Sequence, residues 1–414
     1  MSDQATSQEQ SHTEEDVTYG DIVWGQFKKN KIATASLGLL VALFLLAIYC
    51  PLLASDRPFI WTENGTTSYP WFSSLFDRNY FENSIDVFFN LAMIGVPLIL
   101  LSLFGLNKYL VSIKTEKRPR RKKLLNAMIA GSALFMLTYG AILSQPYKEP
   151  YTQYYELHQQ SIENQDNAVS ATFPMIPYGY RKIGFESLAG PSLKHPMGVD
   201  QSTRDVAVRM LYGTRIALSI GVIAVSIYVS IGIVIGSTAG FFGGLIDLAI
   251  VRFIEIFMSI PGLFVILTVL AFIDQPSIFH IMAVIGLLRW TGVARLVRGE
   301  FLRLRNLDFV SSAIALGFPT SRIIFQHILP NALGPVLVNA TFGVASAILV
   351  ESSLSFLGLG DVSVPSWGQT LSEGYATNAW HLILIPGFAI FITISLLNLV
   401  GEGFRDALDP KMRK

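Results

Sequence analysis

Long apolar runs alternate with polar segments along this chain of 414 residues. A membrane-spanning helix needs about 20 predominantly apolar residues. Runs that meet this length predict about eight spans, at 33–53, 85–106, 124–143, 216–239, 245–273, 277 to beyond 290, 333–356 and 381–400. The pattern therefore predicts an all-α polytopic membrane protein.

Composition agrees with a membrane protein, and the absence of several motifs argues against catalytic and metal-binding sites. Hydrophobic residues make up 51% of the chain and charged residues 15%, whereas a water-soluble domain carries about 25% charged residues. The sequence has no G-x-x-x-x-G-K-[ST] phosphate loop, no metal-ligand spacing of His and Cys, no G-x-S-x-G and no H-E-x-x-H. We therefore expect no catalytic residues, metal or cofactor in this chain, and no nucleic-acid partner.

Basic residues indicate which side of the membrane each polar segment occupies. Lysines precede the first span, and the run KTEKRPRRKK lies between the second and third spans. Because basic segments stay on the cytoplasmic side, both chain ends are expected inside. The basic run also has the charge to contact anionic lipid, so topology alone and lipid binding both stay open. The expected segments are cytoplasmic tails at 1–32 and 405–414, outer loops at 54–84 and 145–212, a helical hairpin at 85–144 and a helical core at 213–404.

The second outer loop is expected to end in an amphipathic helix at the membrane interface. Asp200 and Ser202 offer side-chain oxygens of the kind that cap helix starts. Val206, Met210 and Leu211 then share one helix face. We expect this helix to lead into the fourth span.

Small residues and a proline shape the fourth and fifth spans. Four glycines recur at every fourth position and so share one helix face: Gly232, Gly236, Gly240 and Gly244. Such a face lets two helix backbones approach closely, either within the chain or between subunits. Pro261, followed by Gly262, is expected to kink the fifth span.

Three ionisable residues fall inside predicted spans: Glu255, Arg289 and Glu351. Because a charge in the bilayer is costly, each of them either finds a partner on another helix or at the interface, or lines a transport path. Arg252 lies one helical turn before Glu255, so these two can pair on one helix face. We also expect a contact between Arg289 and Glu255.

The segment after the sixth span is polar, rich in arginine and helical in its periodicity. Its first part, 289–305, is expected to carry four arginines into the cytoplasm: Arg295, Arg298, Arg303 and Arg305. Gly317 then interrupts the helical pattern. Pro319 and Thr320 give start signals for a second short helix, which Pro330 is expected to end.

That second helix presents four apolar residues: Ile323, Ile324, Phe325 and Ile328. The segment is therefore expected to form a helix–glycine–helix at the cytoplasmic face. Physical reasoning leaves two interpretations open, since such an element either docks on a partner or lies on the lipid surface.

The segment resembles the cytoplasmic coupling segment of ABC-transporter permeases, in which E-A-A-x-x-x-G is followed by a stretch ending I-x-x-x-L-P. More closely, the chain resembles the C-type subunit of the oligopeptide, dipeptide and nickel permease family. The stretch SDRPFIWTENGTTSYPWF also resembles the branch that takes up peptide-like antibiotics. Seven stretches, within 24–55 and 195–414, resemble family signatures in family order: WGQFKKNKIATASLGLL, HPMGVDQSTRDVAVRMLYGTRIALSIG, RWTGVARLVRGEFLRLRNLDFV, ILPNALGPVLV, ESSLSFLGLG, PSWGQTL and GEGFRDALDP.

The resemblance implies a type I ABC importer permease fold in the bacterial inner membrane, with a six-helix family core and an inserted helix pair at 85–144. It implies a heterodimer with a second permease subunit, two cytoplasmic ATPases that bind ATP and Mg, and a periplasmic or extracellular solute-binding protein. Oligopeptides or dipeptides are the expected cargo, moved by alternating access. Nickel chelates or another small solute are alternatives, and a secondary transporter that needs no ATP is a further one.

The resemblance also implies roles for particular residues. Ser311 stands where the family motif has glutamate, Ser312 stands at its first alanine, and Ser202-Thr203 replaces an expected glycine. The coupling segment is expected at 309–330, and its ATPase-coupling residues are Ser311, Ser312, Ala313, Gly317, Phe318, Pro319, Arg322, Ile328, Leu329 and Pro330. The residues expected to absorb the motion by helix packing or as a hinge are Gly232, Gly236, Gly240 and Pro261.

Overall fold

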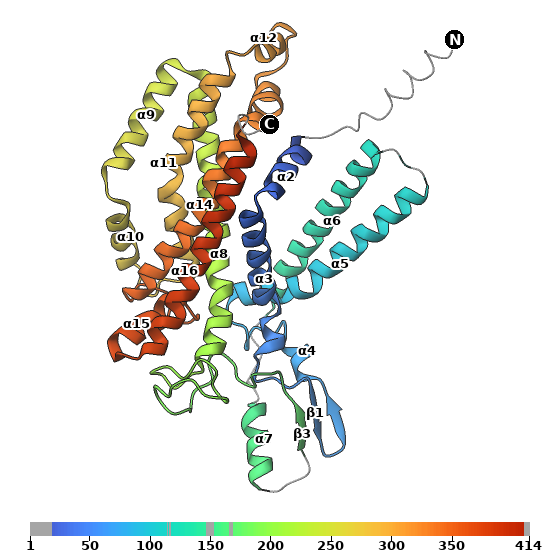
Figure 1. Cartoon of the computed structure of the whole chain (residues 1–414), viewed down its shortest axis with the longest axis vertical. Coiled ribbons are helices and arrows are strands. Elements are labelled where there is room, and N and C mark those ends of the chain that lie inside the picture. Colours follow the sequence, from blue (N-terminus) through green and yellow to red (C-terminus); the bar gives the residue numbers. More distant parts are fainter. Residues whose placement is uncertain (1–18, 114, 116, 146–152, 165–168, 410–414) are drawn as a thin grey trace. The chain divides into compact units, whose positions relative to one another are not determined.

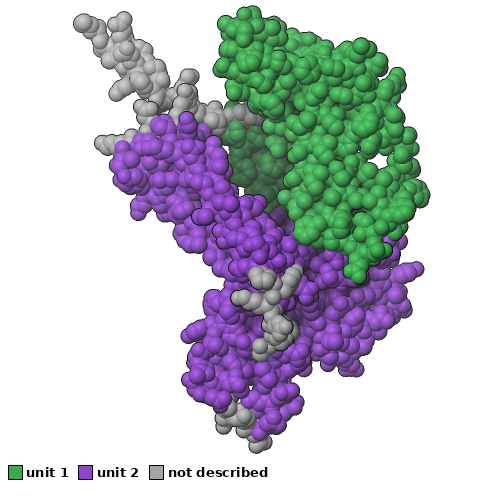
Figure 2. Space-filling view, turned by 180° about the vertical axis from the view of Figure 1, so that it is seen from behind, with its two compact units in different colours: residues 1–41, 220–351, 389–414 green, residues 42–219, 352–388 purple. Residues whose placement is uncertain are grey.

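The computed structural model describes residues 19–113, 115, 117–145, 153–164 and 169–409. The chain forms two compact units, which Figure 2 shows in different colours. Unit 1 contains residues 1–41, 220–351 and 389–414, and unit 2 contains residues 42–219 and 352–388.

Helices make up most of the described chain, as predicted (Figure 1). Seven of the described helices are long and apolar enough to cross a membrane, and the bent pair α9–α10 brings the number of candidate spans to eight. The prediction of a polytopic helical membrane protein with about eight spans is therefore confirmed. The candidate spans are α3 (Lys31–Leu53), α5 (Ser84–Ser112), α6 (Lys117–Leu143), α8 (Val206–Phe242), α9 (Gly244–Ser259) with α10 (Gly262–Ala271), α11 (Ile278–Leu304), α14 (Leu329–Phe356) and α16 (Trp380–Leu408).

The connecting segments contain shorter elements. The helices among them are α2 (Tyr19–Lys29), α4 (Pro70–Ser74), α7 (Tyr154–Glu163), α12 (Asp308–Ala315), α13 (Thr320–Arg322), the π-helix η1 (Ile323–Ile328) and α15 (Trp367–Thr377). The strands are β1 (Ile60–Glu63), β2 (Thr66–Ser68) and β3 (Val169–Thr172), which form an antiparallel sheet in the order β2-β1-β3.

This sheet is an exception to the all-α prediction. Its β1–β2 turn is formed by Asn64 and Gly65, with φ of +50° and +78°, and positive φ at both residues is what a two-residue type I′ hairpin requires. The third strand comes from a distant segment and places Ala171 opposite Trp61. Strands of three or four residues are too short for an alternating pattern to reveal them.

The start of α8 differs from the prediction. The expected interfacial helix and the fourth span form one continuous helix of 37 residues, because no proline separates them. Asp200 and Ser202 do not cap it. Asp205 does, since its Oδ1 accepts a hydrogen bond from the N–H of Val208 at 3.0 Å.

The α9–α10 break is stronger than the predicted kink. The two helices are bent by 73°, and the chain leaves the helical conformation between them, with φ −97° and ψ 125° at Ile260. The following Pro261 disfavours helical geometry at the preceding residue, and here the span is interrupted rather than curved.

The helices α5 and α6 lie side by side as a hairpin in unit 2 (Figure 1). Phe88 of α5 contacts Phe135 and Tyr139 of α6, with ring centroids 5.4 and 5.7 Å apart. The basic loop expected at 108–123 is shorter than predicted, because α5 continues to Ser112 and α6 already begins at Lys117. Lysine and arginine favour helix formation, so much of the basic run is helical.

Candidate functional site

The predicted coupling segment forms a helix–glycine–helix in unit 1. Helix α12 ends in a Schellman motif, in which Phe318 N donates to Ala313 O at 3.1 Å and Gly317 N donates to Ile314 O at 2.9 Å. Gly317 has φ +74°, and a Cβ placed on it would meet nothing within 4 Å. Glycine is therefore favoured here by backbone conformation and not by lack of space.

The second arm of the segment corrects two details of the prediction. Pro319 is extended, at φ −66° and ψ 147°, and precedes α13, as its start signal indicates. Pro330 does not end the second helix, because α13, η1 and α14 follow one another without a break. Pro330 has no N–H to donate to the preceding turn, and the wider π-helical turns of η1 occupy the residues just before it.

The inner face of the segment packs against α11. Val310 and Ala313 of α12 and Ile323 and Ile328 of η1 are all buried in one apolar cluster with Phe301. Ile323 and Ile328 thus form the foot of the segment. The prediction that the second helix presents these two residues is wrong, because both are buried.

The outer face is exposed and partly apolar. Three side chains protrude from the single chain, with exposed fractions of 57% for Ile314, 71% for Leu316 and 64% for Phe325. We call these three residues the apolar tip. Sequence reasoning included only Phe325 among the presented residues and missed Ile314, in the last turn of α12, and Leu316, which directly follows the helix.

The remaining predicted coupling residues are divided between the two faces. Phe318 and Leu329 are half-buried, whereas Ser311, Ser312, Gly317, Pro319, Arg322 and Pro330 are exposed. The Arg322 guanidinium lies 4.1 Å from the centroid of the Phe318 ring, and this ring stacks on His327 at 5.6 Å. These contacts join residues on both sides of Pro319, so the turn after Gly317 is braced.

Most of the arginines before the segment are used within the chain. Arg298 binds both carboxylate oxygens of Asp247, with Nη2 2.7 Å from Oδ2. Arg305 donates to the carbonyls of Gly240 and Phe241 at 3.1 and 3.2 Å. These carbonyls lie in the last turn of α8, where a helix leaves its backbone acceptors without an internal partner. These two arginines therefore hold α11 against α9 and α8.

The glycine face of α8 packs against α11. A Cβ on Gly232 would lie 2.6 Å from the Val293 Cβ, and one on Gly240 would lie 2.5 Å from the Phe301 Cβ. Gly236 is in equally close contact with the backbone of α11 at Ala294. Of the two interpretations, packing within the chain is the one the structure shows. Gly244 does not share this face, because it is the first residue of α9 with φ +55°.

The three ionisable residues of the spans have separate surroundings. Glu255 pairs with Arg252 at 2.7 Å, as predicted. Arg289 donates to the Ser346 hydroxyl, so the expected contact between Arg289 and Glu255 is wrong. Glu351 is 1% exposed. Pro261 precedes α10 at the break described above.

Sequence reasoning overlooked a buried cation in unit 2. Arg215 of α8 is fully buried. Its Nη1 lies 3.0 Å from Asp86 Oδ1, its Nη2 lies 2.9 Å from Asn90 Oδ1, and its Nε donates to the Ala47 carbonyl at 2.8 Å. This network joins α8 to α5 and α3. The sequence did offer a sign of this network, because Asp86 and Asn90 lie four positions apart in an otherwise apolar run.

A second network joins the start of α8 to α15. Arg204 lies 2.8 Å from Asp200 and 3.1 Å from Glu373, and Arg209 lies 3.4 Å from Asp200. Burial raises the pKa of Glu373 above its usual range, although both arginines oppose this. The nearby His195 Nδ1 is 2.7 Å from Asp205. All of these residues except Glu373 belong to the signature stretch at 195–221, so part of that signature is structural.

The structure offers no obvious metal centre in its described ranges. No group of three or more His, Cys, Asp or Glu side chains among those residues is arranged to hold a metal ion.

Two family models match the chain. Residues 232–414 match the binding-protein-dependent transport system inner membrane component, and residues 18–70 match the N-terminal TM domain of oligopeptide transport permease C. Neither range includes residues 71–231, which contain the α5–α6 hairpin.

Curated relatives agree with these matches. The oligopeptide transport system permease protein OppC of Haemophilus influenzae is 41% identical over 245 residues, which cover 58% of this chain and 78% of that protein. The dipeptide transport system permease protein DppC of Alkalihalophilus pseudofirmus is 38% identical over 229 residues, or 55% of this chain and 75% of the relative. A solved structure of the inward-facing MetNI methionine ABC transporter matches at TM-score 0.40 and 18% identity, over 49% of this chain and 96% of that one.

The helical architecture, the matched ranges and the relatives lead to one conclusion. The chain belongs to the family of inner-membrane permease components of binding-protein-dependent ABC transport systems, in the branch of the C-type oligopeptide and dipeptide permeases.

Proposed function

We propose that this chain is one of two membrane-spanning subunits of an ATP-driven importer of oligopeptides or dipeptides. The relatives are named for transport of these two cargoes. The observation that carries the proposal is the apolar tip of Ile314, Leu316 and Phe325, exposed above a buried foot. Exposed apolar residues gathered on a helical element are typical of a docking surface.

The partner at the tip would be a cytoplasmic ABC ATPase that binds ATP and Mg. Helix α12 and the π-helical arm present an apolar projection that would dock on such a subunit. Ser311 has no charge to offer where the resembled motif has glutamate. The apolar tip would therefore supply the main contact, and Ser311 and Ser312 would contribute hydrogen bonds.

The motion of the ATPases would reach the spans through the foot of the segment. Val310 and Ile323 are buried against α11, and η1 continues directly into α14. A push on the tip would therefore act on α11 and α14 together. The close packing of α8 on α11 would carry α8 along, while the break at Pro261 would let α10 move separately. Such movement fits alternating access.

Charged residues on the α9 and α11 surfaces indicate where another subunit or the transport path would lie. The side chains of Arg252 and Glu255 are 69% and 54% exposed in the single chain, and Arg289 is also exposed. Because charges facing lipid are costly, this surface would face the second permease subunit or a water-filled path. Glu351, buried in α14, would serve a structural or path-lining role.

Uptake in proteoliposomes tests the proposal. The chain would be reconstituted with its second permease, its ATPases and its solute-binding protein, and ATP-dependent uptake of a labelled tripeptide measured. Leu316→Asp and Phe325→Asp place a charge in the apolar contact and should lower uptake at least tenfold. Ile22→Asp, at a 39% exposed position of α2, is the matched control and should keep uptake. Normal uptake in both tip variants would refute the coupling role.

A further inference from the structure

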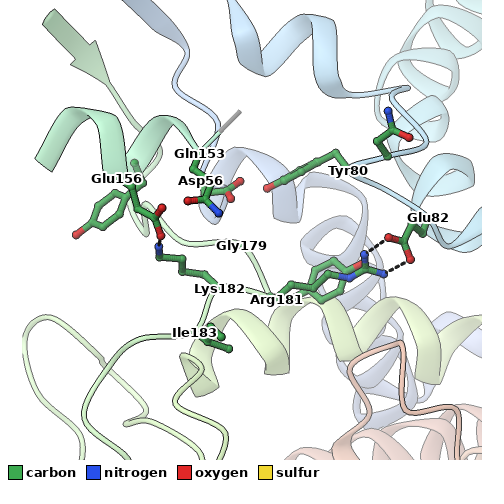
Figure 3. A pocket seen from close by; sticks show the side chains of 12 residues that line it. Asp56, Tyr80, Glu82, Gln153, Glu156, Gly179, Arg181, Lys182 and Ile183 are labelled. Carbon is green, nitrogen blue, oxygen red and sulfur yellow. Dashed lines mark hydrogen bonds and ion pairs between the residues drawn. The ribbon is translucent and has the colours of Figure 1, made fainter. Parts of the chain in front are cut away.

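Unit 2 contains a polar pocket that has no part in the proposed coupling. Its volume is about 320 Å³, near the lower end of the range for small-molecule sites in proteins. The residues that line it include Asp56, Tyr80, Glu82, Glu156, Arg181 and Lys182 (Figure 3). They come from the segment after α3, the segment before α5, helix α7 and the segment before α8. Apart from Asp56 they lie outside both family-matched ranges.

The backbone positions these segments firmly. Ser55 N donates to Ile176 O at 3.1 Å, and Ile176 N donates to Leu53 O at 2.9 Å. The Ser55 hydroxyl also lies 3.2 Å from the Tyr80 hydroxyl. Gly179 also lines the pocket and packs closely on Tyr80, since a Cβ there would be 3.2 Å from the Tyr80 hydroxyl. The pocket is therefore a built cavity and not a gap between loose loops.

An ion pair between a glutamate and a basic residue flanks the pocket on each of two sides (Figure 3). On one side Arg181 binds Glu82 through two bonds of 2.5 and 2.9 Å. On the other side Lys182 pairs with Glu156. Each side thus offers a carboxylate and a cation, and these groups are only partly buried, so a ligand can share them.

Between the two ion pairs lie Asp56 and Tyr80. Both are buried, with exposed fractions of 5% and 9%. Burial and the neighbouring Asp56 carboxylate raise the pKa of Tyr80 well above its usual value, so its hydroxyl remains a donor. The Asp56 carboxylate and the Tyr80 hydroxyl therefore place a hydrogen-bond acceptor and a donor at the pocket wall.

We propose that this pocket binds a short peptide with free termini. The peptide ammonium group would be held by Asp56 and Glu156, and the peptide carboxylate by Arg181 of the other ion pair. The tyrosines that line the pocket would contact the peptide backbone, and the volume limits the ligand to a few residues. The inference rests on the proposed function, because that function makes peptides the cargo available on this side of the membrane.

Blocked peptides test the recognition of both termini on the unaltered protein. The full-length chain in lipid nanodiscs, without ATPases, nucleotide or solute-binding protein, would be titrated calorimetrically with trialanine. The same titration would use N-acetyl-trialanine amide, which lacks both terminal charges. Trialanine should bind at least tenfold more tightly than the blocked peptide. Equal affinities, or no saturable binding of trialanine, would overturn the inference.

Matched variants test the location. Glu156→Gln and Arg181→Met should each weaken trialanine binding at least tenfold, and Gly179→Val should do so by filling the cavity. Glu163→Gln, on an exposed part of the same α7 helix, and Lys194→Met, at an exposed residue outside the pocket, are the controls and should bind normally. Circular dichroism and size-exclusion elution would verify the fold of every variant.

Two outcomes separate this inference from its alternatives. If the pocket variants bind trialanine normally but dock the solute-binding protein more weakly, the pocket is a protein-docking surface and the inference is wrong. Failure of the proposed function would show differently. ATP-driven uptake would then be insensitive to Leu316→Asp, while trialanine binding in nanodiscs, which uses no ATP, would remain.

Discussion

At the residue scale, Thr203 shows how a departure from a signature is accommodated. It stands in place of an expected glycine and has φ +63°, a conformation that costs a β-branched residue about 1–2 kcal/mol. Its Oγ1 accepts a hydrogen bond from Gly184 N at 3.0 Å, which offsets part of this cost. The replacement of glycine by Thr203 therefore affects the backbone of the segment before α8 and not the coupling segment.

Thr203→Gly should raise the thermal stability of the chain in detergent, by about 1 kcal/mol, because glycine removes the strain. The lost hydrogen bond is at the surface, where water can replace it. Thr138→Gly, at an exposed helical position of α6, is the control and should lower stability by about 0.5–1 kcal/mol. Destabilisation by both substitutions would mean that the hydrogen bond to Gly184 outweighs the strain.

Arg215 gives a second residue-scale prediction. Arg215→Met should destabilise the chain by about 3–5 kcal/mol, because Asp86 would be left buried without its cation. Arg303→Met removes an exposed pair with Glu300 and should cost at most about 1 kcal/mol. Thermal unfolding in detergent measures both. An equally small effect of the two variants would show that Asp86 is satisfied without Arg215.

At the element scale, the sequence predicted the long helices and where one of them breaks, but not the short helices α4, α7 and α15. Apolar length located the spans, and Pro261 located the α9–α10 break. The continuity of α8 and the π-helical turns before Pro330 could not be predicted, because both depend on the hydrogen bonds of neighbouring turns. The small sheet was missed because its strands are short and one of them is distant in sequence.

The close packing of α8 and α11 gives the element-scale prediction. Gly236→Leu should destabilise the chain by about 1–3 kcal/mol or more, because the new side chain meets the Ala294 backbone of α11. Gly38→Leu, at a position of α3 with no atom within 4 Å of its Cβ site, should be nearly neutral. Thermal unfolding compares the two. Neutral behaviour of Gly236→Leu would contradict the packing described for this glycine face.

At the scale of the whole molecule, the candidate site was partly predictable. The sequence predicted the helix–glycine–helix because Gly317, Pro319 and the apolar pattern are local signals, and only the resemblance made it a coupling segment. It could not tell which apolar residues are buried, since burial of Ile323 and exposure of Leu316 depend on packing against α11. The pocket of unit 2 was not predicted, because its walls come from four separate segments.

The α5–α6 hairpin also acquires a structural role at this scale. Arg215 ties α5 to α8 and α3 inside unit 2, while most of α6 is exposed in the single chain. The hairpin is therefore anchored by a buried polar network and by apolar packing of Val87 and Ile142 in one cluster with Tyr212. The residues on both sides of the hairpin build the walls of the pocket.

The central claim is that the apolar tip contacts an ATPase, and crosslinking tests it most directly. A photoreactive amino acid would replace Leu316 in the assembled transporter in membranes, with the same replacement at Ile22 as control. Mass spectrometry would identify the crosslinked product. The account predicts that position 316 crosslinks to an ATPase subunit and position 22 does not. Crosslinks from position 316 to lipid alone would contradict it and make the segment a membrane-surface element.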